Sequence, residues 1–146
     1  MQVWEGDNLA IHRGLDEPKP GDVLVNAVTN RSVFGGILAE ICLSKGVTGV
    51  IIDGAVRDIE EMNEMGVAVF ARGTVPAGPS KNGPGYVGKP VACGNVVCNP
   101  GDVVIRGADG IVVVPQSELN ETVQALPGEE DIERQIRSQI KEAVTH

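Results

Sequence analysis

The segment from Gly49 to Glu61 constrains the fold of this 146-residue chain more than any other. It begins with a short run of β-branched apolar residues, Val50–Ile52, which is typical of a strand covered on both faces. The turn dipeptide Asp53-Gly54 ends that run, and charged residues then open a predicted helix that extends to about Met65. Ligand sites of α/β domains often lie at such strand ends, because the turn places side chains at the carboxyl edge of the sheet.

Two interpretations of Arg57 and Asp58 follow from their place at the start of this helix. In the first, both side chains belong to a ligand site at the sheet edge. In the second, Asp58 caps the helix by accepting backbone N–H bonds, and Arg57 pairs on the surface with Glu60 or Glu61. The residues alone leave both interpretations open.

The composition favours one α/β domain with a parallel core. Hydrophobic residues make up 42% of the chain but aromatic residues only 3%, so the core must consist of Val, Ile, Leu and Ala. The formal net charge is −8 and no basic cluster is interleaved with aromatic residues, so we expect no direct binding to nucleic acid.

The cysteines and the apolar runs indicate a cytoplasmic protein. Cys42, Cys93 and Cys98 cannot form a full disulfide set and lack zinc-ligand spacing, so we expect reduced core residues. The apolar runs have the length of strands, and no signal-peptide pattern opens the chain. We therefore expect neither export nor a membrane span.

The first half of the chain alternates predicted strands and helices, which favours a parallel sheet. A short strand and a helix capped by Asp7 come first. His12 lies on that helix and is assigned no role, because a lone helical histidine more often packs than reacts. The elements that follow are a strand at 23–28, a helix at 37–46, the central strand, a helix at 59–65 and a strand at 67–70.

The second half is predicted to be rich in antiparallel strands and to end in helices. Asn99-Pro100-Gly101 and Ala108-Asp109-Gly110 are good turn formers between short apolar runs. Ser117 caps a helix that ends near Pro127-Gly128, and a last helix follows with isoleucines at four-residue steps. We therefore predict an α/β domain over 1–127 and a C-terminal helix over 128–146 that packs on this domain or on a neighbouring subunit. The predicted strands are 91–93, 96–98, 102–105 and 111–114.

Two glycine-rich segments are candidate ligand loops. Gly35-Gly36 either leaves helix N–H groups open to a carboxylate or phosphate, or merely permits a tight turn or close packing against a strand. The long segment 71–90 includes a formal match to the dinucleotide fingerprint, but it holds prolines and leads into no helix, so we reject a nucleotide site. Lys81 is the residue of this segment to watch, although a solvated lysine is the default.

Six segments between Gly6 and Pro115 occur in an order that points to a known family. Together they resemble the family that joins the RraA-type regulators of ribonuclease activity to the class II pyruvate aldolases. This resemblance implies a swivelling β/β/α fold, a mixed sheet with flanking helices, and a homotrimer or hexamer with active sites between subunits. The segments are Pro20–Val25, Gly35–Ala39, Gly49–Asp58, Phe70–Gly73, Asn99–Val104 and Asp109–Pro115.

The resemblance also implies roles for individual residues. Aldolases of this family carry Arg-Asp-x-x-Asp/Glu after a glycine loop, and Arg57, Asp58 and Glu61 match this pattern. Asp58 would hold Mg²⁺ or Mn²⁺ largely through waters, Arg57 would contact the pyruvyl carboxylate and keto oxygen, and Glu61 would lie in the outer shell. The remaining expected substrate contacts are the backbone amides of Gly36, Ile37 and Leu38, and Lys81, which matches a lysine of the family's long loop.

The function implied by the resemblance is a divalent-metal-dependent lyase. It would cleave 4-hydroxy-2-oxo acids such as 4-hydroxy-4-methyl-2-oxoglutarate to pyruvate, with oxaloacetate decarboxylation as a side activity. The alternative is a non-catalytic regulator that binds a ribonuclease or helicase through an acidic surface. Two features depart from the family pattern: the N-terminus is short, as expected of a fragment or a shortened paralogue, and the loop after Gly36 lacks the acidic residue of some aldolases.

Overall fold

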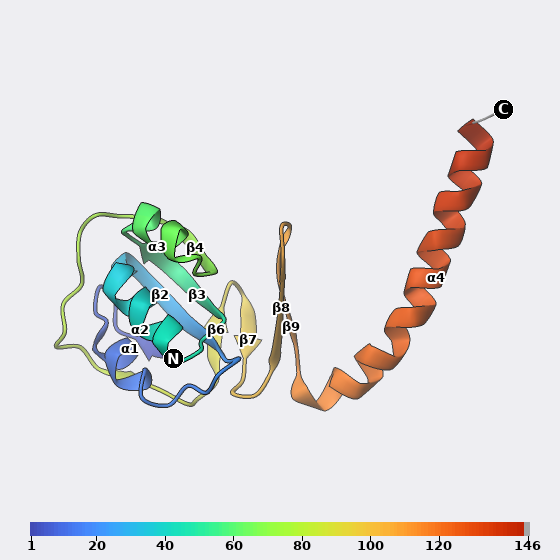
Figure 1. Cartoon of the computed structure of the whole chain (residues 1–146). Coiled ribbons are helices and arrows are strands. Elements are labelled where there is room, and N and C mark those ends of the chain that lie inside the picture. The colour runs from blue at the N-terminus through green and yellow to red at the C-terminus, as the bar shows by residue number, and fades with distance from the viewer. Residues whose placement is uncertain (145–146) are drawn as a thin grey trace. The chain divides into compact units, whose positions relative to one another are not determined.

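A computed structural model describes residues 1–144, apart from the side chains of residues 27–30 and 144. The chain divides into two compact units, Met1–Pro100 and the part from Gly101 onward (Figure 1). Our prediction of a domain over 1–127 with a separate segment over 128–146 stays a prediction, and its last two residues lie outside the described part.

The first unit is built on a five-stranded mixed sheet with the strand order β4-β3-β2-β1-β5. β2 pairs with β3 and β3 pairs with β4 in parallel, which confirms the predicted parallel core. β5 pairs antiparallel with β1 at one edge. The strands are β1 (Gln2–Val3), β2 (Val23–Phe34), β3 (Gly49–Val56), β4 (Val69–Thr74) and β5 (Gly85–Tyr86), and an antiparallel pair, β6 (Val91–Cys93) and β7 (Val96–Cys98), completes the unit.

The helices of this unit are α1 (Leu9–Gly14), α2 (Gly36–Ser44) and α3 (Ile59–Met65). The predicted cap of α1 is wrong by one residue, because Asn8 holds the N-cap position. Asp7 still serves the helix start, since its carboxylate accepts the Leu9 N–H at 2.9 Å. Prediction of α3 was accurate, because glycines and charged residues mark both of its ends.

The core of the first unit is aliphatic, as the composition predicted. β3 contributes Val50 and Ile52, and β2 contributes Val33 and Phe34, all of them buried. All three cysteines are free and buried, which confirms their predicted place in the core. Such a core buries apolar surface between the sheet and the helices, and this burial is the main stabilising contribution to folding.

The second unit contains the antiparallel hairpin of β8 (Val103–Gly107) and β9 (Gly110–Val114), the 3₁₀ helix Gln116–Glu118 and the helix α4 (Leu119–Val144). The prediction of two helices separated at Pro127-Gly128 was wrong, because α4 continues through Pro127. Proline forfeits one N–H bond but its φ is compatible with a helix, and a 26-residue helix is cooperative enough to tolerate that loss. In the described part of the chain, no helix is both long and apolar enough to cross a membrane.

A buried carboxylate fastens the long loop after β4 to the start of α1. Asp7 is only 1% exposed. Its Oδ2 accepts hydrogen bonds from the Ser80 hydroxyl at 2.7 Å, from the Asn82 N–H at 2.6 Å and from the Gly83 N–H at 2.8 Å. Burial alone would raise the pKa of Asp7, but the hydrogen bonds from Leu9, Ser80, Gly83 and Asn82 outweigh it and lower the pKa to about 2.

We predict that Asp7→Asn lowers the free energy of unfolding of the first unit by about 2 kcal/mol at pH 7, because an amide cannot accept all of these bonds. The Asp7 pKa is lower in the folded than in the unfolded chain. Its contribution to stability is therefore complete above about pH 4 and is lost as the pH falls toward about 2. Urea titrations of both proteins between pH 7 and pH 2 should show the difference shrinking with acidity.

The exposed Asp16 provides the control for this prediction. Asp16→Asn should change the unfolding free energy by less than about 0.5 kcal/mol, because exposed ion pairs contribute little. An equally small effect of Asp7→Asn at pH 7 would contradict the role of Asp7 as the anchor of the loop.

Candidate functional site

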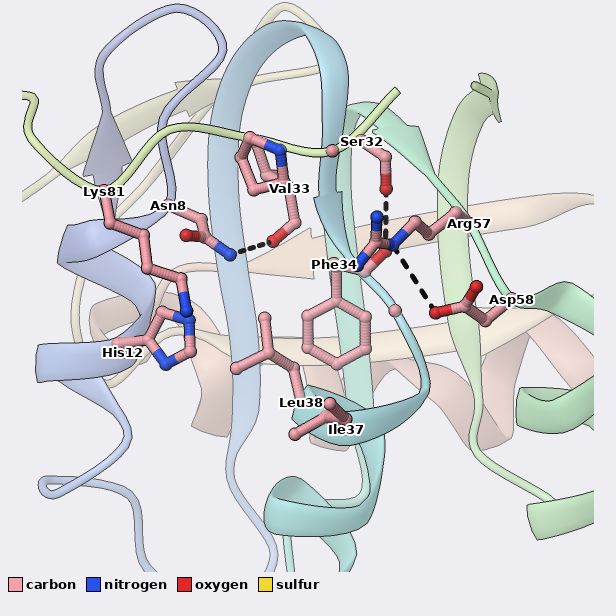
Figure 2. A pocket seen from close by; sticks show the side chains of 13 residues that line it. Asn8, His12, Ser32, Val33, Phe34, Ile37, Leu38, Arg57, Asp58 and Lys81 are labelled. Carbon is pink, nitrogen blue, oxygen red and sulfur yellow. Dashed lines mark hydrogen bonds and ion pairs between the residues drawn. The ribbon is translucent and has the colours of Figure 1, made fainter. Parts of the chain in front are cut away.

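A pocket of about 230 Å³ lies in the first unit, where the end of β2, the start of α2 and the β3–α3 turn meet α1 and the long loop (Figure 2). Five of the predicted site residues line it: Ile37, Leu38, Arg57, Asp58 and Lys81. The two others, Gly36 and Glu61, lie against this group, because Glu61 occupies the space that a side chain at position 36 would need. The structure thus brings together residues from three separate segments of the sequence.

Asp58 bridges two helices instead of capping its own. It holds the N-cap position of α3 in the left-handed conformation, with φ 58° and ψ 42°, yet its side chain makes no capping bond. Its Oδ2 instead accepts the Gly36 N–H at 3.1 Å, at the start of α2. The helix-cap interpretation of the Asp58 side chain is therefore wrong. A non-glycine residue in this backbone region carries strain, which is common at functional sites.

The paired glycines allow two carboxylates to approach the start of α2. A Cβ atom at Gly35 would lie 2.5 Å from Asp58 Oδ2, and one at Gly36 would collide with the Glu61 carboxylate. The first bond of the helical ladder runs from Ala39 N–H to the Gly35 carbonyl, so the N–H groups of Ile37 and Leu38 precede that ladder. Close packing and anion binding, the two interpretations of these glycines, are thus compatible.

Arg57 is held on both sides of its side chain. Its Nε lies 3.5 Å from Asp58 Oδ2, and its Nη1 packs so closely on Gly78 of the long loop that a Cβ there would lie 2.8 Å away. Its backbone N–H donates to the Phe34 carbonyl at 3.0 Å, which ties the β3–α3 turn to the end of β2. The guanidinium is half exposed and faces the pocket from this position (Figure 2).

The opposite end of the pocket contains Asn8 and His12, which sequence reasoning missed, beside the predicted Lys81. Asn8 is the N-cap of α1, His12 lies on α1, and Lys81 comes from the long loop (Figure 2). Burial, and then the positive charge of Lys81, lower the pKa of His12 below its ordinary value and so favour the neutral ring. A sequence signal existed, since Asn8 and His12 are four residues apart on one helical face. Only the anchored loop, however, places Lys81 beside them.

The donor set fits a hydrated hard cation better than a fully caged metal. Among the described residues, no three His, Cys, Asp or Glu side chains form a metal-binding group. The oxygens that remain are those of Glu61 and Asp58 Oδ1, because Asp58 Oδ2 is engaged by Gly36 and Arg57. Mg²⁺ commonly binds through one or two carboxylates and keeps several waters.

The sequence resembles one protein family and several of its named members. The family model RraA-like (Aldolase/RraA) matches residues 1–113. A putative 4-hydroxy-4-methyl-2-oxoglutarate aldolase of Halalkalibacterium halodurans is 35% identical over 127 residues, which are 85% of this chain and 60% of that protein. A 4-hydroxy-4-methyl-2-oxoglutarate aldolase of Thermus thermophilus is 32% identical over 119 residues, which are 80% of this chain and 72% of that protein.

A solved structure with a similar fold is named as a member of a ribonuclease-inhibitor family and not as an aldolase. The crystal structure of Streptomyces coelicolor RraAS2, described as an unusual member of the RNase ES inhibitor RraA protein family, is 34% identical. It superposes with a TM-score of 0.83 over 93% of this chain and 72% of that one. The predicted resemblance and the predicted α/β fold are therefore confirmed, and the chain belongs to the RraA-like (Aldolase/RraA) family.

Proposed function

We propose that the chain is a divalent-metal-dependent lyase that cleaves 4-hydroxy-2-oxo acids such as 4-hydroxy-4-methyl-2-oxoglutarate to pyruvate. Decarboxylation of oxaloacetate would be a side activity of the same site. The observation that carries the proposal is the convergence of Arg57, Asp58 and the start of α2 on one pocket. The names of the relatives support it, although the chain spans only 60% of the length of the Halalkalibacterium protein.

The binding step uses the positive groups at one end of the pocket. The planar guanidinium of Arg57 suits a carboxylate, and the N–H groups of Ile37 and Leu38 lie at the positive end of the α2 dipole. A 2-oxo acid bound there places its carboxylate and keto oxygen beside Arg57. Lys81, at the other end, would supply a positive charge near the distal polar groups of the substrate.

The chemical step needs stabilisation of the negative charge that develops on the 2-oxo oxygen when the carbon–carbon bond breaks. Arg57, which contacts Asp58 and Gly78, would stabilise that charge. Asp58 and Glu61 would hold Mg²⁺ or Mn²⁺, which supplies further electrostatic stabilisation when bound. We also propose that the chain forms a homotrimer or a hexamer with active sites between its subunits.

A second candidate function is a non-catalytic regulator that binds a ribonuclease or helicase. The formal net charge of −8 and the inhibitor name of the Streptomyces relative favour it. Co-purification with such a partner, without any metal-stimulated release of pyruvate, would support this candidate over the lyase.

We predict pyruvate release from 4-hydroxy-4-methyl-2-oxoglutarate and from oxaloacetate with Mg²⁺ or Mn²⁺, and its loss in EDTA. Arg57→Ala and Asp58→Ala should each lower kcat/KM by about 100-fold, because each removes a charge at the reacting end of the pocket. Arg13→Ala, on the exposed side of α1, should retain full activity. Metal-independent release, or full activity of Asp58→Ala, would refute the proposed lyase.

We also predict that Gly36→Ala weakens Mn²⁺ binding by about tenfold, because the added methyl group displaces the Glu61 carboxylate. Gly73→Ala is the matched control, since its Cβ would meet no atom within 4 Å. Titration followed by the electron paramagnetic resonance of free Mn²⁺ measures both variants. Equal Mn²⁺ affinities in the two would exclude Glu61 from the metal site.

A further inference from the structure

Asn8 carries an unpaired acceptor at the wall of the pocket. The side chain is only 4% exposed, and its Nδ2 donates to the Val33 carbonyl at 3.1 Å. This bond fixes the orientation of the amide, so Oδ1 faces the other way. Oδ1 is buried and has no hydrogen-bond partner among the described residues. A buried acceptor without a hydrogen bond lowers the stability of the fold, so such atoms usually accept a hydrogen bond from a ligand or an ordered water.

The unpaired oxygen faces the end of the pocket that holds His12 and Lys81 (Figure 2). The backbone N–H of His12 donates to the backbone carbonyl of Asn8 at 3.2 Å, so both side chains lie on one face at the start of α1. The ammonium group of Lys81 is close enough to His12 to act on its titration. The environment therefore combines an acceptor with a strong donor.

A hydroxyl group matches this combination better than other common substituents. It donates to Asn8 Oδ1 and accepts from the Lys81 ammonium at the same time. A carboxylate would place one oxygen lone pair against another at Asn8. An ammonium would be repelled by Lys81, and a methyl group would leave Oδ1 unpaired.

We propose that Asn8 is a specificity-determining residue that accepts the hydrogen bond of the substrate's hydroxyl group, at the end of the pocket opposite Arg57. The inference rests on the proposed 2-oxo acid site, because a carboxylate bound at Arg57 directs the far carbon atoms of the ligand toward α1. Oδ1 has almost no exposed surface of its own. The ligand therefore reaches it when the lining side chains shift, and the long, exposed Lys81 can shift while its ammonium group stays beside the ligand.

The test compares two ligands that cannot be cleaved because carbon 2 carries a hydroxyl in place of the keto group. These are 2,4-dihydroxyglutarate and 2-hydroxyglutarate, which differ only in the hydroxyl at carbon 4. Calorimetric titration with Mg²⁺ present should show about tenfold tighter binding of the dihydroxy acid to the wild-type chain. Asn8→Ala should bind both acids equally, whereas Asn63→Ala, on the exposed side of α3, should keep the tenfold preference.

The ratio of the two affinities separates recognition from a structural role. If Asn8→Ala weakens both acids by the same factor and keeps the preference, Asn8 acts only through Val33 and the inference is overturned. Asn8→Asp provides a second variant because it keeps the acceptor and loses the donor, so its preference for the dihydroxy acid should persist. A wild-type chain without any preference overturns the inference alone, while one that binds neither acid overturns the proposed 2-oxo acid site as well.

Discussion

The contact between the Asp58 carboxylate and the Gly36 N–H is the interaction on which the candidate site depends. It joins the start of α2 to the start of α3, which follow different strands of the parallel sheet. The contact requires a left-handed backbone at Asp58 and two glycines at the beginning of α2. The same carboxylate then steadies Arg57. The strained backbone of Asp58, the two glycines at the start of α2 and the Asp58–Arg57 ion pair therefore depend on one another.

A second aspartate performs an equivalent task at the other end of the pocket. Asp7 binds the backbone of the long loop at Asn82 and Gly83, and it binds the Ser80 hydroxyl as well. Because the loop is fastened at these points, Lys81 points toward His12 at the same end of the pocket. Loops of this length cost entropy to order, so a buried and fully bonded carboxylate is an effective anchor. The long loop therefore contributes to both ends of the pocket, through Lys81 beside His12 and through Gly78 against Arg57.

The two proposed functions, lyase and regulator, involve the same pocket residues and differ in whether the bound acid is cleaved. In both proposals, a pocket with a cationic end at Arg57 and a mixed polar end at Asn8 would bind a hydroxylated acid, whether or not a carbon–carbon bond is broken. Turnover by the proposed lyase would additionally need Asp58 and Glu61 to hold a cation next to the bound acid. The two functions thus share a binding step, and metal-dependent release of pyruvate distinguishes them.

Secondary structure followed closely from local patterns in the first unit. The apolar run at Val50–Ile52 and the glycine after Met65 marked β3 and α3 correctly, because strand burial and helix termination are written in a few adjacent residues. The same reasoning failed at Pro127, where proline was expected to end a helix. One of the two interpretations of Asp58 was also wrong, because it expected the side chain to cap its own helix. A residue that caps α3 and one that bonds to the start of α2 can have the same neighbours in the sequence.

The sequence by itself determined the α/β class, the parallel core and the family, because periodicity, turn chemistry and ordered motifs are local properties. It also identified Ile37, Leu38, Arg57, Asp58 and Lys81, which line the pocket. Only the tertiary structure decided that Asp58 bonds to α2, that Glu61 lies over Gly36, and that Asn8 and His12 share a pocket with Lys81. These contacts join residues more than twenty positions apart, or residues whose proximity depends on an anchored loop. Their distances are set by the packing of the sheet, the helices and the loop, which spacing along the chain does not encode.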